Sequence, residues 1–135
     1  MNIIVCIDDK CGMLFGGRRL SRDIRLCENI LEVVNGDTLY MNEYSYGLFE
    51  TLSAKNIKVN ESFLKKAKAN DYCFVENASI EEYAKSINKV LLYRWNRVYP
   101  SDVKFDMSVL EDKKLLSTTE FAGNSHDKIT LEVYK

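Results

Sequence analysis

The chain has 135 residues, of which 46% are hydrophobic and 29% are charged, and its formal net charge is −1. This length and balance predict a single domain over residues 1–135 with a buried core. They exclude a disordered chain and a polybasic surface for nucleic acid or anionic lipid. The sequence shows no basic leader and no run of about 20 apolar residues, so we expect a cytoplasmic protein that does not contact a membrane.

Cysteine and histidine usage argues against a metal site. The four cysteines, Cys6, Cys11, Cys27 and Cys73, include no C-x-x-C pair. Two of them lie in apolar strand-like runs, where a reduced thiol behaves as a small hydrophobe. His126 is the only histidine and falls in a predicted turn. This placement speaks against a Ser-His-Asp triad and against a histidine-built metal centre.

Strand and helix signals alternate along the first two thirds of the chain. Residues 2–8 form a short continuous apolar run, which predicts a strand buried on both faces. From Ile24 to Val34 apolar residues recur at helical spacing, and the Asn-Gly pair at 35–36 suits the left-handed backbone that ends a helix. Residues 37–41 then predict a second strand.

Further elements of both kinds are predicted before residue 96. In chain order they are a short helix over 42–52, a helix over 61–69, a strand over 70–76, a helix over 80–87 and a strand over 89–95. Asn60 precedes the second of these helices as a cap, and Ser79 and Glu82 have the spacing of a capping box for the third.

The last third of the chain predicts an antiparallel hairpin. Residues 114–121 and 128–134 alternate apolar and polar side chains on either side of a turn-like segment at 122–127. Right-handed crossovers between the earlier strands would make those strands mostly parallel. The sequence therefore predicts an α/β fold with a mostly parallel central sheet flanked by helices and ending in a C-terminal antiparallel hairpin.

Four segments of the chain resemble the dihydrofolate reductases. Residues 3–14, IIVCIDDKCGML, resemble the first strand of that family and the loop after it. LSRD at 20–23 stands where the family has a Leu-Pro-x-Asp/Glu segment that supplies a buried acid. Residues 89–105 and 120–134 resemble its late strand with the following loop and its C-terminal hairpin. The resemblance implies a dihydrofolate reductase-like fold and makes Asp23 the counterpart of the family's acid.

The segments that hold the cofactor in that family differ here. The stretch 41–50, MNEYSYGLFE, lacks the Arg and Thr of the family's phosphate-contacting Gly-Arg-x-Thr segment. Where the family has glycines that let backbone amides approach a pyrophosphate, this chain has Glu76, Asn77 and Ala78. These residues add a negative charge and side chains where phosphate would lie. We therefore expect no cofactor, with NADPH bound only weakly if at all.

The surroundings of the acid are altered as well. The family's Pro-Trp pair is missing from GGRRLSRD at 16–23, and Tyr93 replaces the strand threonine that hydrogen-bonds the acid. Between the second predicted helix and the strand at 70–76 the chain is too short for both edge strands that carry adenosine contacts in the family. The resemblance thus implies a trimmed sheet and a changed ligand pocket.

Asp23 has two interpretations from the sequence. A negative charge in the first turn of a helix is favourable by about 0.3–1 kcal/mol, so Asp23 is either a helix-start charge or an acid that contacts a ligand. We take Asp23 as the candidate catalytic residue and Arg18, Arg19 and Tyr93 as candidate ligand contacts. Adjacent arginines are more often solvated, and the loop 11–20 is either a glycine-hinged lid or a flexible connection.

Nucleic-acid binding is not expected. Tyr93, Trp95 and Tyr99 interleave with arginines, as on a surface that stacks single-stranded bases. However, Tyr93 and Trp95 share one face of their strand with Leu91, which is typical of a packed strand.

Three functional hypotheses follow. The favoured one is a diverged dihydrofolate reductase-like protein that binds a small molecule or a protein partner in the old cleft without ordinary NADPH-dependent folate reduction. The second is a diverged reductase of a pterin-like or other heterocycle, in which Asp23 assists protonation of the substrate. The third is a structural or regulatory protein that acts as a homo-oligomer. The sequence leans away from an enzyme without excluding one.

Overall fold

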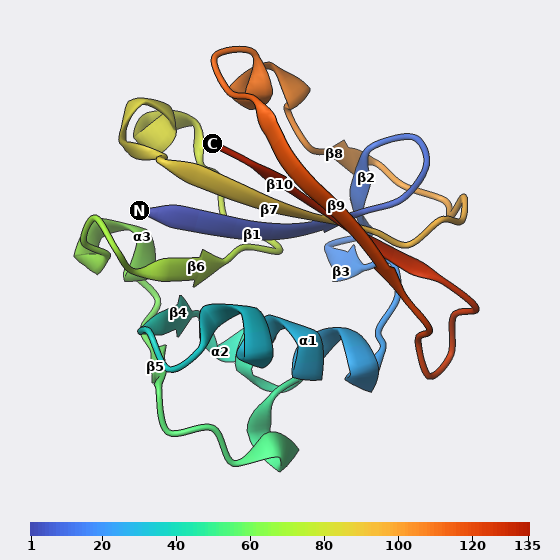
Figure 1. Ribbon diagram of the computed structural model, residues 1–135, viewed down its shortest axis with the longest axis horizontal. Helices are drawn as coiled ribbons and strands as arrows, with labels where there is room; N and C mark the ends of the chain where they lie inside the picture. Colours follow the sequence, from blue (N-terminus) through green and yellow to red (C-terminus); the bar gives the residue numbers. More distant parts are fainter.

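The computed structural model describes residues 1–135 and contains two β-sheets (Figure 1). The larger sheet has the strand order β5-β4-β6-β1-β7-β10-β9. Its strands are β1 Asn2–Ile7, β4 Leu39–Met41, β5 Ile57–Val59, β6 Tyr72–Phe74, β7 Lys89–Arg94, β9 Leu115–Phe121 and β10 Ile129–Tyr134. The smaller sheet has the order β3-β2-β8 and comprises β2 Gly12–Phe15, β3 Arg18–Arg19 and β8 Val103–Lys104.

The central strands run parallel, which confirms the predicted α/β architecture. β1 pairs in parallel with β6 and β7, and β4 pairs in parallel with β5 and β6. β10 is antiparallel to both of its neighbours, β7 and β9. The predicted C-terminal hairpin therefore forms one edge of the sheet, and its turn lies beside the start of the long helix (Figure 1).

Only one helix is long. The helices are α1 Ile24–Val34, α2 Glu43–Tyr46 and α3 Phe63–Lys66, with 3-10 turns η1 Glu50–Leu52, η2 Glu81–Ser86 and η3 Met107–Leu110. α1 buries most of the predicted apolar stripe, including Leu26, Ile30 and Val34, but Ile24 at its start is exposed. It ends as predicted at Asn35, whose φ of 49° is left-handed and whose amide donates to the carbonyl of Leu31. No helix in the structure has the length and apolar character needed to cross a membrane.

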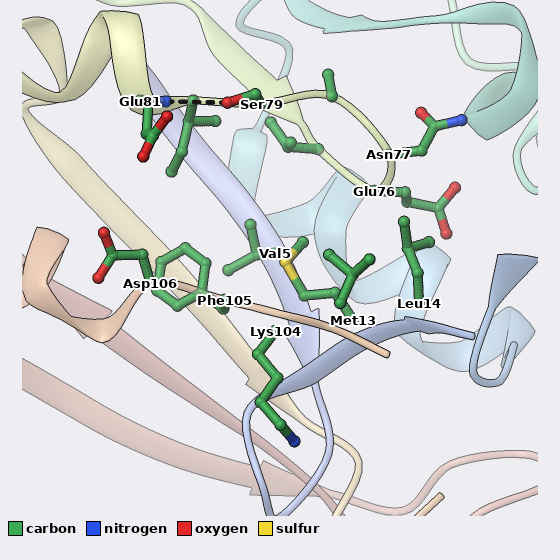
Figure 2. A pocket seen from close by; sticks show the side chains of 14 residues that line it. Val5, Met13, Leu14, Glu76, Asn77, Ser79, Glu81, Lys104, Phe105 and Asp106 are labelled. Carbon is green, nitrogen blue, oxygen red and sulfur yellow. Dashed lines mark hydrogen bonds between the residues drawn. The ribbon is translucent and has the colours of Figure 1, made fainter. Parts of the chain in front are cut away.

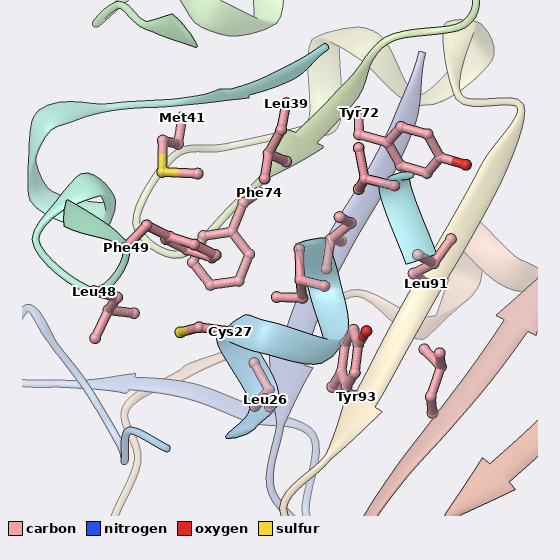
Figure 3. Close-up of a cluster of buried hydrophobic side chains, with 14 of the residues drawn as sticks. Leu26, Cys27, Leu39, Met41, Leu48, Phe49, Tyr72, Phe74, Leu91 and Tyr93 are labelled. Atoms are coloured by element: carbon pink, nitrogen blue, oxygen red, sulfur yellow. The ribbon is translucent and has the colours of Figure 1, made fainter. Parts of the chain in front are cut away.

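Both faces of the large sheet are buried, because alternate residues of each central strand enter different clusters. Ile4 of β1 packs on the α1 side, whereas Ile3 and Val5 pack on the side of α3, η2 and η3. Figure 3 shows the α1 side, where Phe49 meets Phe74 edge-on with ring centroids 5.4 Å apart. This two-sided burial explains why β1 has a continuous apolar sequence rather than an alternating one.

The segment 11–20 is a β-hairpin, which corrects its reading as a flexible connection. β2 and β3 pair antiparallel, and β2 also pairs with β8. Gly16 and Gly17 join the two strands with φ values of 59° and 76°. Glycine is favoured there because a tight turn requires left-handed backbone, so the two glycines serve the turn.

Several short elements also differ from the sequence prediction. The helix expected over 61–69 is reduced to α3, because Ala67 is extended and Asp71 accepts a hydrogen bond from the amide of Lys68 at 2.8 Å. The helix expected over 80–87 is the 3-10 turn η2, and no capping box forms there. One edge strand that local patterns did not reveal, β5, is present next to β4.

Two substitutions on α1 test the assignment of its buried face. Ile30 is fully buried, whereas Val33 is 36% exposed on the same helix. We expect Ile30→Ala to lower the free energy of unfolding by about 2–5 kcal/mol, because the cavity left in the core cannot close fully. Val33→Ala should change it by less than about 0.5 kcal/mol. Urea unfolding measures both, and equal losses would contradict this packing of α1.

Candidate functional site

The carboxylate of Asp23 joins the start of α1 to the turn between β9 and β10. Asp23 is the cap residue of α1, and it accepts a hydrogen bond from the amide of Arg25 at 2.9 Å. The same carboxylate accepts from the amides of Asn124 at 2.9 Å and Ser125 at 2.8 Å, and from the Ser125 hydroxyl at 3.2 Å. Its side chain is 0% exposed. Donors within the protein therefore occupy both carboxylate oxygens.

These donors set the protonation state of Asp23. Burial alone would raise its pKa, but the hydrogen bonds from Asn124, His126, Ser125 and Arg25 outweigh burial and hold the pKa well below the ordinary value. Asp23 is therefore ionised at neutral pH. An acid that stays protonated in a water-free cleft would need a raised pKa instead.

His126 receives its orientation from Asp23 and Trp95. The ring Nδ1 lies 2.9 Å from the Asp23 carboxylate, and the ring stacks on the indole of Trp95 with centroids 4.6 Å apart. Because the partner of Nδ1 is an ionised carboxylate, Nδ1 carries a proton and donates it. In the neutral ring, Nε2 is then the acceptor.

The acceptor nitrogen faces two hydroxyl groups. Nε2 of His126 lies 3.0 Å from the Ser21 hydroxyl and 3.0 Å from the Tyr99 hydroxyl. The Tyr99 hydroxyl also donates to the Ser21 oxygen at 3.3 Å. Asp23, His126 and Ser21 thus form a continuous hydrogen-bonded chain, and the expectation against a Ser-His-Asp arrangement is wrong as a statement about geometry.

Asp8 positions the backbone that carries Tyr99. Its carboxylate, at the end of β1, accepts from the amides of Gly12 at 2.7 Å, Lys10 at 2.9 Å and Tyr99 at 3.0 Å. Burial would raise the pKa of Asp8, but these backbone hydrogen bonds lower it overall. A second buried carboxylate therefore holds the loop after β7 against the loop after β1.

Arg19 forms a bidentate ion pair with Glu76. Its guanidinium makes two hydrogen bonds to the Glu76 carboxylate, at 2.8 and 2.9 Å, and lies over the Tyr44 ring at 4.1 Å from the centroid. Burial alone would lower the pKa of Arg19, but the bonds and charge of Glu76 raise it. Ser45 donates a further hydrogen bond to Glu76 at 2.8 Å. The negative charge expected from Glu76 is therefore matched by a cation from the neighbouring hairpin.

The other two predicted ligand contacts lie in different environments. Arg18 is exposed at the start of β3. Tyr93 is fully buried in the core and donates a hydrogen bond to Asn29 at 2.7 Å. A ligand could reach Tyr93 only if the core opened, so the structure does not bring Arg18, Arg19 and Tyr93 together in one accessible site.

A cavity of about 360 Å³ opens beside the ends of β1 and β6 (Figure 2). Its lining is mainly apolar and includes Val5, Met13 and Phe105. The charged residues around it are Glu76, Glu81, Lys104 and Asp106. Since Arg19 neutralises Glu76, two carboxylates and one ammonium group remain, and the rim is slightly acidic.

A much smaller cleft adjoins this cavity. It has room for about one water molecule, with a volume of about 10 Å³, and Ser21, Trp95 and Arg19 line it. Met13, Val75 and Glu76 line both the cleft and the larger cavity.

Metal binding and thiol chemistry find no support in the side-chain arrangement. No three His, Cys, Asp or Glu side chains gather where they could hold a metal ion. Burial raises the pKa of both Cys27 and Cys73 to about 12, and it also raises that of Cys6. These three thiols are therefore neutral and poor nucleophiles at pH 7.

Sequence reasoning missed Ser21, Tyr99 and His126 as a group. They come from three segments separated by more than 25 residues each, and none lies in a local motif. The one available signal was the predicted hairpin, because its turn at 122–127 was expected to pack against another part of the chain. Nothing in the sequence identified the start of α1 as that surface.

Comparison with known proteins supports the fold alone. No protein-family model matches the sequence, and no curated protein matches it. Among solved structures, dihydrofolate reductase from Enterococcus faecalis, in complex with NADP(H) and RAB-propyl, is similar with a TM-score of 0.67. The match covers 98% of this chain and 94% of that chain at 11% sequence identity. The chain therefore has a dihydrofolate reductase-like fold, as its sequence resemblance implied.

Replacing Asp23 tests its role as a buried, ionised connector. We expect Asp23→Asn to lower the free energy of unfolding at pH 7 by about 2–4 kcal/mol, because donors aimed at a carboxylate lose their partner. Asparagine is as good a helix cap as aspartate, so capping does not account for this loss. Asp106→Asn is the control, since Asp106 caps η3 at an exposed site with Ser108 as its partner.

The same variant has a defined pH dependence. The native pKa of Asp23 is lowered, so its stabilisation is complete above the unfolded-state value of about 3.9 and is lost as pH falls below that value. The difference between wild type and Asp23→Asn should therefore be largest near neutral pH and should shrink by about pH 3. A difference that grows on acidification, measured by urea unfolding, would contradict the lowered pKa.

Gly123 tests how closely the hairpin turn approaches Asp23. A Cβ atom at Gly123 would lie 2.6 Å from the Asp23 carboxylate and 2.8 Å from the His126 carbonyl oxygen. We expect Gly123→Ala to lower stability by about 1–3 kcal/mol through this overlap. Gly47→Ala is the control, because its nearest neighbour would be 3.4 Å away. Thermal unfolding that leaves Gly123→Ala unchanged would argue against the close approach.

Proposed function

We propose that the protein binds an uncharged or cationic small molecule with an apolar surface in the 360 Å³ cavity, and that it does not carry out ordinary NADPH-dependent folate reduction. The observation that carries this proposal is the lining of the cavity, which is apolar inside and slightly acidic at its rim. Concave, mostly apolar pockets of this size are typical of small-molecule sites.

The charges around the cavity argue against an anionic cofactor. Glu81 and Asp106 lie at the rim, opposed by Lys104. The guanidinium of Arg19 lines the adjoining cleft, but its Nε and Nη2 donate to the Glu76 carboxylate, and Nη2 also donates to the Tyr44 carbonyl. A pyrophosphate entering here would meet two carboxylates without gaining a free arginine.

The backbone of the same segment also disfavours a phosphate. Glu76, Asn77 and Ala78 stand where a glycine-rich turn would let amides approach the anion, and the Asn77 side chain is held by Asn42 at 2.7 Å. The similar Enterococcus reductase was solved with NADP(H). We propose that this chain keeps the corresponding fold with a different ligand preference.

The first experiment is a thermal-shift panel with NADPH, folic acid, uncharged aromatic heterocycles and cationic aromatic amines. A ligand at about 100 times its dissociation constant should stabilise the protein by about 2.7 kcal/mol. Ala78→Phe, which fills the cavity, should abolish the shift given by an uncharged or cationic hit. Ala69→Phe places the same side chain at an exposed position away from the cavity and should leave it unchanged. A shift that survives Ala78→Phe would refute the cavity as the site.

Calorimetry with NADPH tests the loss of the cofactor site. We expect a dissociation constant weaker than about 100 μM for the wild type. Glu76→Gln should tighten NADPH binding about tenfold, because it removes a negative charge and releases Arg19. Glu82→Gln, which removes an exposed carboxylate outside the cavity lining, is the control. Low-micromolar binding by the wild type would contradict the proposal.

A further inference from the structure

We propose that Ser21, His126 and Asp23 form an acyl-transfer centre that hydrolyses esters or thioesters of small uncharged acyl groups. The three side chains lie in the order that general-base activation of a serine requires. Asp23 contacts Nδ1 of His126 at 2.9 Å, and Nε2 contacts the Ser21 hydroxyl at 3.0 Å. Nucleophile, base and orienting carboxylate are recognised by this geometry, whatever the fold that carries them.

The histidine is held in the tautomer that the reaction needs. The ionised Asp23 fixes the proton on Nδ1, and stacking on Trp95 fixes the plane of the ring. Nε2 is left as the base that faces Ser21. Asp23 contacts neither nucleophile nor substrate in this scheme, so it is a positioning residue, whereas Ser21 and His126 are catalytic.

Tyr99 is placed to stabilise the negative charge that develops during the reaction. Its hydroxyl lies 3.3 Å from the Ser21 oxygen and 3.0 Å from Nε2 of His126. When Ser21 attacks a carbonyl carbon, the new oxyanion forms next to the serine oxygen, within reach of this donor. Asp8 holds the Tyr99 backbone through a 3.0 Å hydrogen bond, which keeps the hydroxyl in position.

The reaction proceeds in two balanced halves. The Ser21 oxygen bonds to the carbonyl carbon while its proton moves to Nε2 of His126. The tetrahedral intermediate then expels the alcohol or thiol, which takes that proton. In the second half, water gives a proton to Nε2 and adds to the acyl carbon. The bond to Ser21 breaks, the serine regains its proton, and a carboxylic acid leaves. Ester and water are thus converted to acid and alcohol with no other reactant.

The cavity next to the serine indicates the substrate class. Ser21 lines the one-water cleft, which shares Met13, Val75 and Glu76 with the larger apolar cavity. The cleft itself holds only about one water molecule, so this scheme places the acyl chain in the larger cavity, whose slightly acidic rim disfavours a carboxylate on that chain. This choice of acyl pocket rests on the proposed function, whereas the nucleophilic role of Ser21 does not.

Covalent labelling tests the nucleophile directly. We expect an alkyl fluorophosphonate to form one adduct per chain, mapped by peptide mass spectrometry to Ser21. p-Nitrophenyl butyrate should be hydrolysed at least about 10 times faster by the wild type than by Ser21→Ala. Ser117→Ala, at an exposed serine on β9, should retain full labelling and activity. Tyr99→Phe should slow labelling about 100-fold if its hydroxyl is the oxyanion donor.

The role of Asp23 needs a readout separate from stability. Asp23→Asn and Ile30→Ala both destabilise the fold, but only Asp23→Asn should lose fluorophosphonate labelling at a temperature where circular dichroism shows both variants folded. Absence of any adduct on wild-type Ser21, or an adduct mapped elsewhere, overturns the acyl-transfer centre. If Ala78→Phe leaves the labelling rate unchanged but abolishes preference for butyrate over acetate, both proposals stand. If Ala78→Phe changes neither the labelling rate nor the acyl preference, Ser21 remains the nucleophile and the cavity is not the acyl pocket.

Discussion

The fold and the candidate site both depend on one buried carboxylate. Asp23 caps α1, receives the amides of the β9–β10 turn and orients His126, although these groups are about 100 residues apart in the chain. A buried charge with so many donors is stable only while all of them are in place, because each lost donor leaves an unpaired group away from water. Hairpin, helix start and imidazole are therefore coupled, and none can shift independently.

The same fold can hold different chemistry because the site residues lie in its loops. The position that resembles the family's acid is occupied by aspartate, yet here the carboxylate faces the C-terminal turn. Arg19 and Glu76 form a bidentate ion pair where the resemblance implied a phosphate cradle. Fold similarity at 11% identity fixes the arrangement of strands and leaves the reaction undetermined.

The sequence predicted the parts of this protein that depend on local pattern. The short continuous apolar run of β1, the helical stripe of α1 and the alternating strands of the hairpin are each local signals, so their type and order were predicted correctly. The polar contacts of the site could not be predicted from these local patterns. Residues 21, 99 and 126 meet only because the sheet edge returns beside α1, and no periodicity encodes that meeting. Likewise, Glu76 looked like an uncompensated charge because its partner, Arg19, lies on another element.

The tautomer of His126 is the most direct measure of the coupling through Asp23. His126 is the only histidine, so its two ring nitrogens give the only imidazole signals in a nitrogen-15 NMR spectrum. At about pH 9, where an ordinary imidazole is neutral, we expect the proton on Nδ1 and a bare Nε2 that accepts from Ser21. A neutral ring protonated on Nε2 would contradict the hydrogen bond to Asp23 and remove the base from Ser21.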